Sequence, residues 1–146
     1  MTDQSARNSV AGTWRMTDAY AEVDGDRVPL YGGRADGLLV FTEDLRFVEV
    51  LRDTGIAPFA AAERENGTAE ENAAAVAGAL GQYGTYALDE EGAFAGNTIV
   101  GSTFPNWNDL ARTTDQLRMV VDGDTLSEQL TDPGAPPVTI VYARVG

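Results

Sequence analysis

The sequence predicts an all-β protein: a single antiparallel β-barrel of about eight strands with one inserted short α-helix at about residues 69–81. Three observations support this fold class. Short runs rich in β-branched and aromatic residues recur along the chain, separated by turn signals. The length of 146 residues fits one domain. An aromatic loop, residues 102–107, lies between two of these runs, and exposed rings are unfavourable in a loop that packs against nothing.

We expect a flexible N-terminus at residues 1–10 and a barrel domain at residues 11–146. The expected strands of this domain are residues 11–23, 37–42, 45–52, 82–88, 94–103, 116–121, 125–130 and 138–145. Asp-Gly turns at 24–26 and 122–124 indicate hairpins, while residues 28–33 indicate an irregular rim segment. Eight antiparallel strands enclose an interior that side chains fill or that holds one small ligand.

The helix is predicted from a capping box, in which Thr68 and Glu71 satisfy each other's backbone N–H groups. Apolar residues follow at helical spacing up to Leu80, and Gly81 provides an end signal. The apolar face consists almost wholly of small residues, so the helix can lie close to a sheet or across a barrel end. Two roles remain open for it: a plug or lid, or a simple bridge between two strands.

Three residue types are missing from the chain: histidine, lysine and cysteine. Their absence excludes Ser-His and Cys-His nucleophile systems, Schiff-base chemistry and the usual zinc sites. Acid–base work therefore falls to Asp, Glu, Tyr or water. The formal charge of −13 argues against nucleic acid and anionic membranes as partners, because both need a basic surface.

No apolar run reaches the length of a membrane helix, and residues 1–9 lack the apolar core of a signal peptide. With no cysteine, these features favour the cytoplasm. We expect no cofactor and no metal. The expected partner is a small hydrophobic molecule, bound by a monomer or homodimer.

The chain carries a series of short motifs in this order: Gly12-Thr13-Trp14, Tyr31-Gly32, Gly37-Leu38-Leu39, Tyr83-Gly84-Thr85-Tyr86, Ser102 to Trp107 with Phe-Pro-Asn-Trp, Gln116-x-Arg118 and Val141-Tyr142-Ala143-Arg144. The first resembles the opening of a first lipocalin strand, and the whole series resembles the bacterial lipocalin-like domain family. The chain departs from the family at residues 96–99, where members commonly carry histidines, and in a longer segment between Trp107 and Gln116.

The resemblance implies a calycin-type barrel with an internal cavity. Some lipocalin-like barrels are cofactor-free cyclases of secondary metabolism, and others only carry ligands. The resemblance also implies that Trp14 and Arg144 come from the first and last strands, where a cation–π contact closes the barrel.

Asp18 and Glu49 are the candidate catalytic residues, because a carboxyl in an apolar cavity becomes a usable acid or base near neutral pH. Asp18 shares a strand face with Trp14, unless a bulge turns it outward. Glu49 faces inward if Phe47 and Leu51 do; the alternative places Val48 and Val50 inside.

Phe104 and Trp107 are the leading candidates for ligand contact, although both rings could instead cap the core. On residues 116–119 only one alternating pair can be interior, either Gln116 and Arg118 or Leu117 and Met119. Asn97 can hold a carbonyl group, and tyrosine hydroxyls can donate to one. The full set of candidate substrate-binding residues is Tyr20, Phe41, Phe47, Tyr86, Asn97, Phe104, Trp107, Arg118, Met119 and Tyr142.

Two hypotheses of function follow. The first is a cofactor-free cyclase or isomerase that folds a polyketide-like intermediate into a reactive conformer and polarises a carbonyl. The second is a non-catalytic carrier of a small hydrophobic metabolite.

Overall fold

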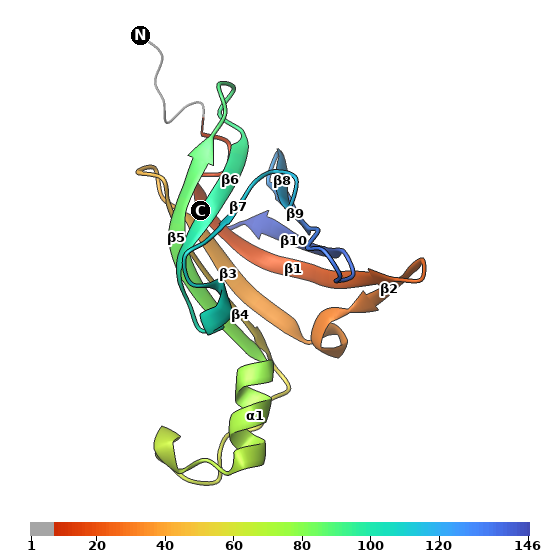
Figure 1. Cartoon of the computed structure of the whole chain (residues 1–146), viewed down its shortest axis with the longest axis vertical. Coiled ribbons are helices and arrows are strands. Elements are labelled where there is room, and N and C mark those ends of the chain that lie inside the picture. Colours follow the sequence, from red (N-terminus) through yellow and green to blue (C-terminus); the bar gives the residue numbers. More distant parts are fainter. Residues whose placement is uncertain (1–7) are drawn as a thin grey trace.

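The computed structural model describes residues 8–146 and consists mainly of antiparallel β-structure (Figure 1). Within those residues, ten strands form one sheet in the order β7-β6-β5-β4-β3-β1-β10-β9-β8, with β2 added beside β1. The strands are β1 Gly12–Val23, β2 Asp26–Pro29, β3 Ala35–Phe41, β4 Arg46–Asp53, β5 Ala79–Leu88, β6 Phe94–Ser102, β7 Leu110–Arg112, β8 Leu117–Asp122, β9 Thr125–Leu130 and β10 Val138–Arg144.

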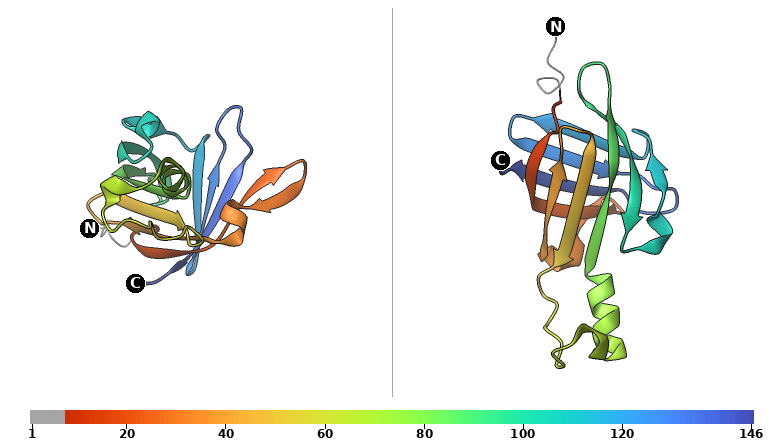
Figure 2. Two further views of the ribbon diagram at one scale, coloured as in Figure 1. Left: turned by 90° about the horizontal axis from the view of Figure 1, so that it is seen from below. Right: turned by 90° about the vertical axis from the view of Figure 1, so that its left-hand side faces the viewer.

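The sheet curls into a nearly closed barrel, as two further views show (Figure 2). Strands β7 and β8 are the two ends of the hydrogen-bonded order, and β8 also packs near β6. The predicted fold class is confirmed, with two strands that the sequence analysis did not include. Every residue of β2 is exposed, so it lacks the alternation that marks a strand. Strand β7 is only three residues long.

Strand β1 holds the barrel together because it pairs with both β3 and β10. Trp14 is fully buried on β1 and lies opposite Arg144 of β10. The Arg144 guanidinium carbon is 4.2 Å from the centroid of the indole ring, and Nη1 donates to the Ala11 carbonyl at 2.9 Å. This confirms the expected cation–π contact between the first and last strands.

Side-chain alternation along β4 decides which residues enter the barrel. Phe47, Glu49 and Leu51 are buried, whereas Val48 and Val50 are about half exposed. A strand turns alternate side chains to opposite faces, so the two buried apolar neighbours carry Glu49 inside with them.

A cluster of aromatic rings fills one end of the barrel. The Phe41 ring lies 4.8 Å from Tyr86 in an edge-to-face arrangement and 6.0 Å from Phe94. Val10 is completely buried in the same core, and the Trp14 Nε1 donates to its carbonyl at 2.8 Å. The flexible N-terminus expected at residues 1–10 is therefore wrong at Val10; residues 1–7 of that expectation lie outside the described part of the chain.

The α-helix, α1 (Ala69–Ala77), projects beyond the other end of the barrel (Figures 1 and 2). The predicted capping box is present: Glu71 N donates to Thr68 Oγ1, and Thr68 N donates to Glu71 Oε1. The predicted C-terminal end is wrong, because the helix stops before Gly78 and β5 begins at Ala79. No residue of α1 is buried, and Val76 is 74% exposed, so the helix does not plug the barrel.

Candidate functional site

A cavity of about 210 Å³ lies inside the barrel, between the aromatic end and the end that carries α1. Its walls are mostly aliphatic and aromatic. Leu39, Leu117, Met119 and Ile140 are among the buried residues that line it. An enclosed, mainly apolar space with a few polar side chains is the usual form of a small-molecule site.

Two glutamates that line this cavity, Glu49 and Glu128, both contact the hydroxyl of one tyrosine, Tyr142. The Tyr142 hydroxyl is 2.7 Å from Glu49 Oε2 and 3.0 Å from Glu128 Oε1. Gln82 Nε2 donates to the other oxygen of Glu49 at 2.9 Å. Both glutamates and Tyr142 are almost completely buried, and they come from three different strands. Such buried polar groups are tolerated only because they are hydrogen-bonded to one another.

Burial changes the acidity of all three groups. Desolvation raises the pKa of Glu49, against the opposing effect of its hydrogen bonds from Tyr142 and Gln82. Desolvation and then the charge of Glu49 raise the pKa of Glu128 well above its ordinary value. Desolvation, followed by the charges of the two glutamates, also raises the pKa of Tyr142 well above its ordinary value. The cluster therefore retains protons that exposed groups would lose.

Arg112 of β7 brings a positive charge to the same cavity. It is buried, and Nη2 donates to Asp132 Oδ2 at 3.3 Å. Its guanidinium carbon lies 4.9 Å from the centroid of the Trp107 ring, which places the cation over the indole. The charge of Arg112 lowers the pKa values of Glu49 and Glu128, opposing the larger effect of desolvation.

Three buried polar atoms of cavity-lining residues have no hydrogen-bond partner among residues 8–146: Gln82 Oε1, Asn97 Oδ1 and Arg112 Nε. A buried polar atom without a partner costs about 1–3 kcal/mol, so such atoms are rare in folded proteins. Here three of them occur around one cavity. Two are acceptors and one is a donor, so together they suit a guest that carries both kinds of polar group.

A wider groove of about 930 Å³ lies between α1 and the barrel rim. It shares four residues with the inner cavity: Tyr31, Leu51, Leu80 and Trp107. Phe104, 43% exposed, lines the groove and meets the Trp107 ring edge to face at 5.1 Å. Trp107 therefore stands at the boundary between the groove and the cavity.

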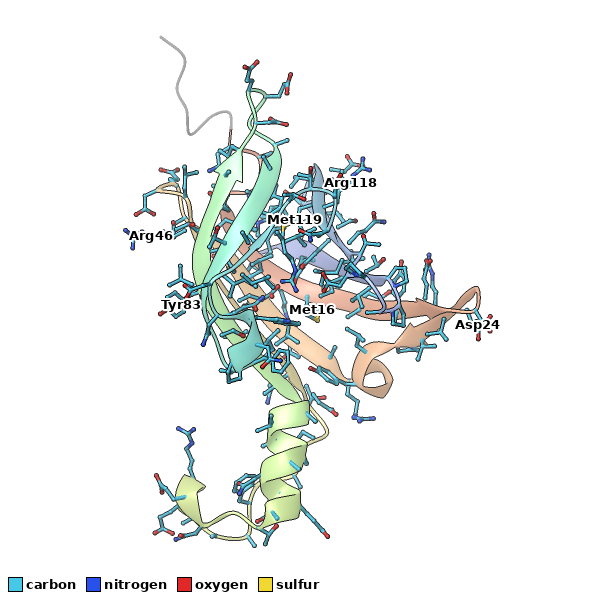
Figure 3. All side chains as sticks on the ribbon, in the orientation of Figure 1. Met16, Asp24, Arg46, Tyr83, Arg118 and Met119 are labelled. Atoms are coloured by element: carbon cyan, nitrogen blue, oxygen red, sulfur yellow. The ribbon has the colours of Figure 1, made fainter. Side chains whose placement is uncertain are left out.

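Five of the predicted site residues line the cavity: Phe47, Glu49, Asn97, Trp107 and Met119. Tyr142 joins them through its hydroxyl, which contacts two of the lining residues, Glu49 and Glu128. Figure 3 shows Met119 inside the barrel and Arg118, its neighbour on β8, directed outward.

Three predicted site residues lie elsewhere on the barrel wall, so their assignment to the cavity is wrong. Asp18 is exposed because β1 is bulged between Met16 and Asp18, which turns its side chain outward. Arg118 is exposed because Leu117 and Met119 take the interior positions of β8. Tyr20 is half-buried outside the cavity, beneath the Arg27 guanidinium at 4.4 Å.

Three more predicted contacts lie in other regions. Phe41 and Tyr86 belong to the aromatic end, where the Tyr86 hydroxyl donates to the Thr42 carbonyl at 2.6 Å. Phe104 lines the outer groove and not the cavity. All three were predicted as substrate-binding residues, and none of them lines the inner cavity.

The sequence analysis missed Glu128, Arg112 and Gln82. Glu128 had a usable signal: it alternates with Leu126 and Leu130 on β9, the pattern that indicates an inward side chain. Arg112 lies in a strand too short to show a period. Gln82 is the first residue of a predicted strand, and no alternation before it fixes its direction.

No helix among residues 8–146 is long and apolar enough to cross a membrane. In the same part of the chain, no group of three or more histidine, cysteine, aspartate or glutamate side chains is placed so that it could hold a metal ion.

A nearly closed antiparallel barrel with an apolar, partly polar-lined cavity defines a small-molecule-binding type of architecture. The family model described as the lipocalin-like domain matches residues 11–138, and the chain belongs to that family. Among solved structures, a Schistosoma mansoni fatty acid binding protein in complex with arachidonic acid is similar at 13% identity. The alignment covers 96% of this chain and 98% of that one, with a TM-score of 0.46. A comparison with curated protein sequences finds no significant match.

Proposed function

We propose that this protein binds a small, largely apolar molecule that carries an oxygen function, inside the cavity beside Trp107. The supporting observation is the group of three unpartnered polar atoms around an otherwise apolar space. The apolar part of the guest packs against the apolar walls. Its oxygen function accepts a hydrogen bond from Arg112 Nε or donates one to the amide oxygens of Gln82 and Asn97. A pure hydrocarbon would leave all three atoms unsatisfied.

A matched pair of ligands tests this proposal. Tetralin and 2-tetralone have the same fused rings, but only 2-tetralone carries a carbonyl oxygen. Calorimetric titration is expected to show tighter binding of 2-tetralone, by about tenfold, which corresponds to about one net hydrogen bond. Equal affinity for the two, or no binding of either, would contradict the proposal.

Trp107 provides an optical control, because it borders the cavity while Trp14 is fully buried beneath Arg144. Ligand is expected to change the tryptophan fluorescence of the wild-type protein. The Trp107→Phe variant retains Trp14 as a reporter and is expected to lose most of that change. A full response in this variant would place the ligand elsewhere.

A second candidate function is a cofactor-free isomerase or cyclase that acts on a polyketide-like intermediate. The specific observation in its favour is the buried contact of Glu49, Tyr142 and Glu128 at the cavity wall. Burial raises the pKa of both glutamates, and a raised pKa makes a carboxyl group a better proton donor and acceptor in catalysis.

Ring closure of a linear poly-β-ketone separates the two functions. If the protein is a cyclase, closure is faster with wild-type protein than in buffer, and the Glu128→Gln variant loses the acceleration. If it is a carrier, the linear compound binds and its closure rate is unchanged.

A further inference from the structure

We propose that Glu49, Tyr142 and Glu128 share one carboxyl proton and form a proton-transfer site for an enolisable ketone bound in the cavity. This inference rests on the proposed binding function and assigns a chemistry to the same site. Glu49 from β4 and Glu128 from β9 line the cavity, and the hydroxyl of Tyr142 from β10 contacts both of them.

The number of protons needed for the two contacts of the Tyr142 hydroxyl supports a shared carboxyl proton. A phenol has one proton, so the Tyr142 hydroxyl can donate to only one carboxyl group at a time. Its oxygen nevertheless lies at hydrogen-bond distance from both Glu49 Oε2 and Glu128 Oε1. The second contact is a hydrogen bond only if that carboxyl is protonated and donates to the phenol oxygen. The geometry therefore fits one carboxylic acid and one carboxylate.

The surrounding charges also favour one carboxylic acid and one carboxylate in this pair. Arg112 on β7 is the cation whose charge reaches both glutamates, and it is itself paired with Asp132. Gln82 on β5 donates to Glu49, which favours Glu49 as the ionised member. Burial and the charge of Glu49 raise the pKa of Glu128 well above its ordinary value, which makes Glu128 the neutral member. Two buried carboxylates would repel each other across one phenol, as in other carboxyl pairs that hold one proton.

The proposed step is enolisation. The Glu49 carboxylate removes a proton from the carbon next to the carbonyl, and the C–H electron pair forms a C=C bond. The carbonyl π pair moves onto oxygen, which takes the proton of Glu128, and the hydrogen bond from Glu128 to the Tyr142 oxygen breaks. One proton enters the pair and one leaves, so charge and electrons balance without an oxidant or reductant.

Tyr142 acts as a positioning residue that resets the pair. After enolisation Glu49 is the acid and Glu128 is the carboxylate. The phenol accepts the proton of Glu49 and gives its own proton to Glu128, which restores the starting state. The phenol oxygen already contacts both carboxyl groups, so this transfer needs no movement of the backbone.

A ketone is the substrate class that fits the unpartnered atoms. Arg112 Nε is a donor without a partner, suited to a carbonyl oxygen. Gln82 Oε1 and Asn97 Oδ1 are acceptors without partners, suited to the O–H group that enolisation creates. The site therefore offers polar contacts to both the keto and the enol forms of one guest.

Deuterium exchange of 2-tetralone in D2O tests the inference, because enolisation removes a C–H proton next to the carbonyl and the return to the ketone in D2O puts a deuteron in its place. Proton NMR follows the loss of that signal. We expect wild-type protein to accelerate exchange over buffer at the same pD. Glu49→Gln and Glu128→Gln are each expected to reduce the acceleration by about a hundredfold or more. Glu43→Gln changes an exposed glutamate and serves as the matched control with unchanged exchange.

Tyr142→Phe separates proton resetting from a purely structural role. The variant keeps the ring and loses only the hydroxyl, so binding of 2-tetralone is expected to persist while exchange slows. The pH dependence of the exchange rate is expected to shift as well, because the two carboxyl groups no longer share the phenol. If the variant binds 2-tetralone normally and exchanges it at the wild-type rate and pH dependence, the shared-proton assignment is wrong.

The binding and exchange measurements distinguish two kinds of failure. Binding of 2-tetralone without accelerated exchange would overturn the proton-transfer site and leave the proposed binding function intact. Failure of 2-tetralone to bind would overturn both. Acceleration that persists in both glutamate variants would also overturn the inference, since the catalytic groups must then lie elsewhere. Urea unfolding of each variant checks that lost exchange does not reflect lost folding.

Discussion

At one end of the barrel, strands β3 to β6 supply Phe41, Phe47, Tyr86 and Phe94, which pack ring against ring. Toward the other end, β4 and β5 supply Glu49 and Gln82 to the cavity wall. The two regions share strands, and Phe47 itself touches both. The aromatic region gains free energy by burying apolar surface, whereas the polar region holds groups that are costly to bury. The comparison assigns fold stabilisation to the aromatic region, and the cost of the polar region fits the ligand binding proposed for it.

The largest predicted effect concerns the aromatic region. Phe41→Ala removes a ring that is 2% exposed and packed against three other rings, so unfolding free energy is expected to fall by about 3–5 kcal/mol. Urea denaturation measures the change. Val48→Ala, on the exposed side of β4, is the control and is expected to change the value by about 0.5 kcal/mol or less. A small loss for Phe41→Ala would mean that this end is not the stabilising core.

The next effect concerns ligand selectivity at the polar region. Arg112→Met keeps a long apolar side chain and removes the unpartnered Nε donor. We expect it to weaken binding of 2-tetralone by about tenfold and to leave the weaker binding of tetralin nearly unchanged. Calorimetric titration of both ligands gives the ratio. An equal loss for both would show that Arg112 acts by packing and not by contacting the oxygen.

A smaller effect concerns the pH dependence of stability. Glu128 has a raised pKa in the folded protein, so the native state binds the proton more tightly than the unfolded state does. The associated stability is complete below the ordinary pKa of 4.5 and is lost as pH rises through the folded-state value. Glu128→Gln removes this titration, so its unfolding free energy is expected to fall less than that of the wild type from acidic to neutral pH. A steeper fall of the unfolding free energy in the variant would show that the pKa of Glu128 is not raised in the folded protein.

The smallest effect concerns α1, which belongs to neither region. Val76→Ser changes a side chain that is 74% exposed, so stability is expected to change by about 0.5 kcal/mol or less. Binding of 2-tetralone in the inner cavity is expected to remain the same. A marked loss of affinity would show that α1 covers the bound ligand, as the lid interpretation of its small apolar face required.

The fold was predictable from sequence because most strands show alternation and are bounded by turn residues. Trp14 and Arg144 also indicated closure between the first and last strands. Every residue of the missed strand β2 is exposed, and β7 has only three residues. Neither strand therefore shows the alternation of buried and exposed side chains that predicts a strand. The helix end was misplaced because Leu80 continues the helical spacing, although it already pairs with Leu51 in the β-sheet.

The site was predictable only in part. The alternation along β4 offered two faces and did not choose between them, and the structure buries the face with Phe47, Glu49 and Leu51. The same reasoning failed for Asp18, because a single bulge reverses the direction of every later side chain and leaves no clear sequence signal. The meeting of Glu49, Glu128 and Tyr142 depends on sheet curvature that brings distant strands together, which no local pattern in the sequence reports.

The most direct test of ligand binding in the polar region uses the methionine methyl groups. The chain has three methionines, and the structure describes Met16 and Met119 (Figure 3). Met119 lines the cavity, whereas Met16 lies in the core outside its lining. With methyl-labelled methionine, addition of 2-tetralone is expected to shift the Met119 resonance much more than that of Met16. Measured binding that leaves Met119 unmoved would contradict a guest in this cavity.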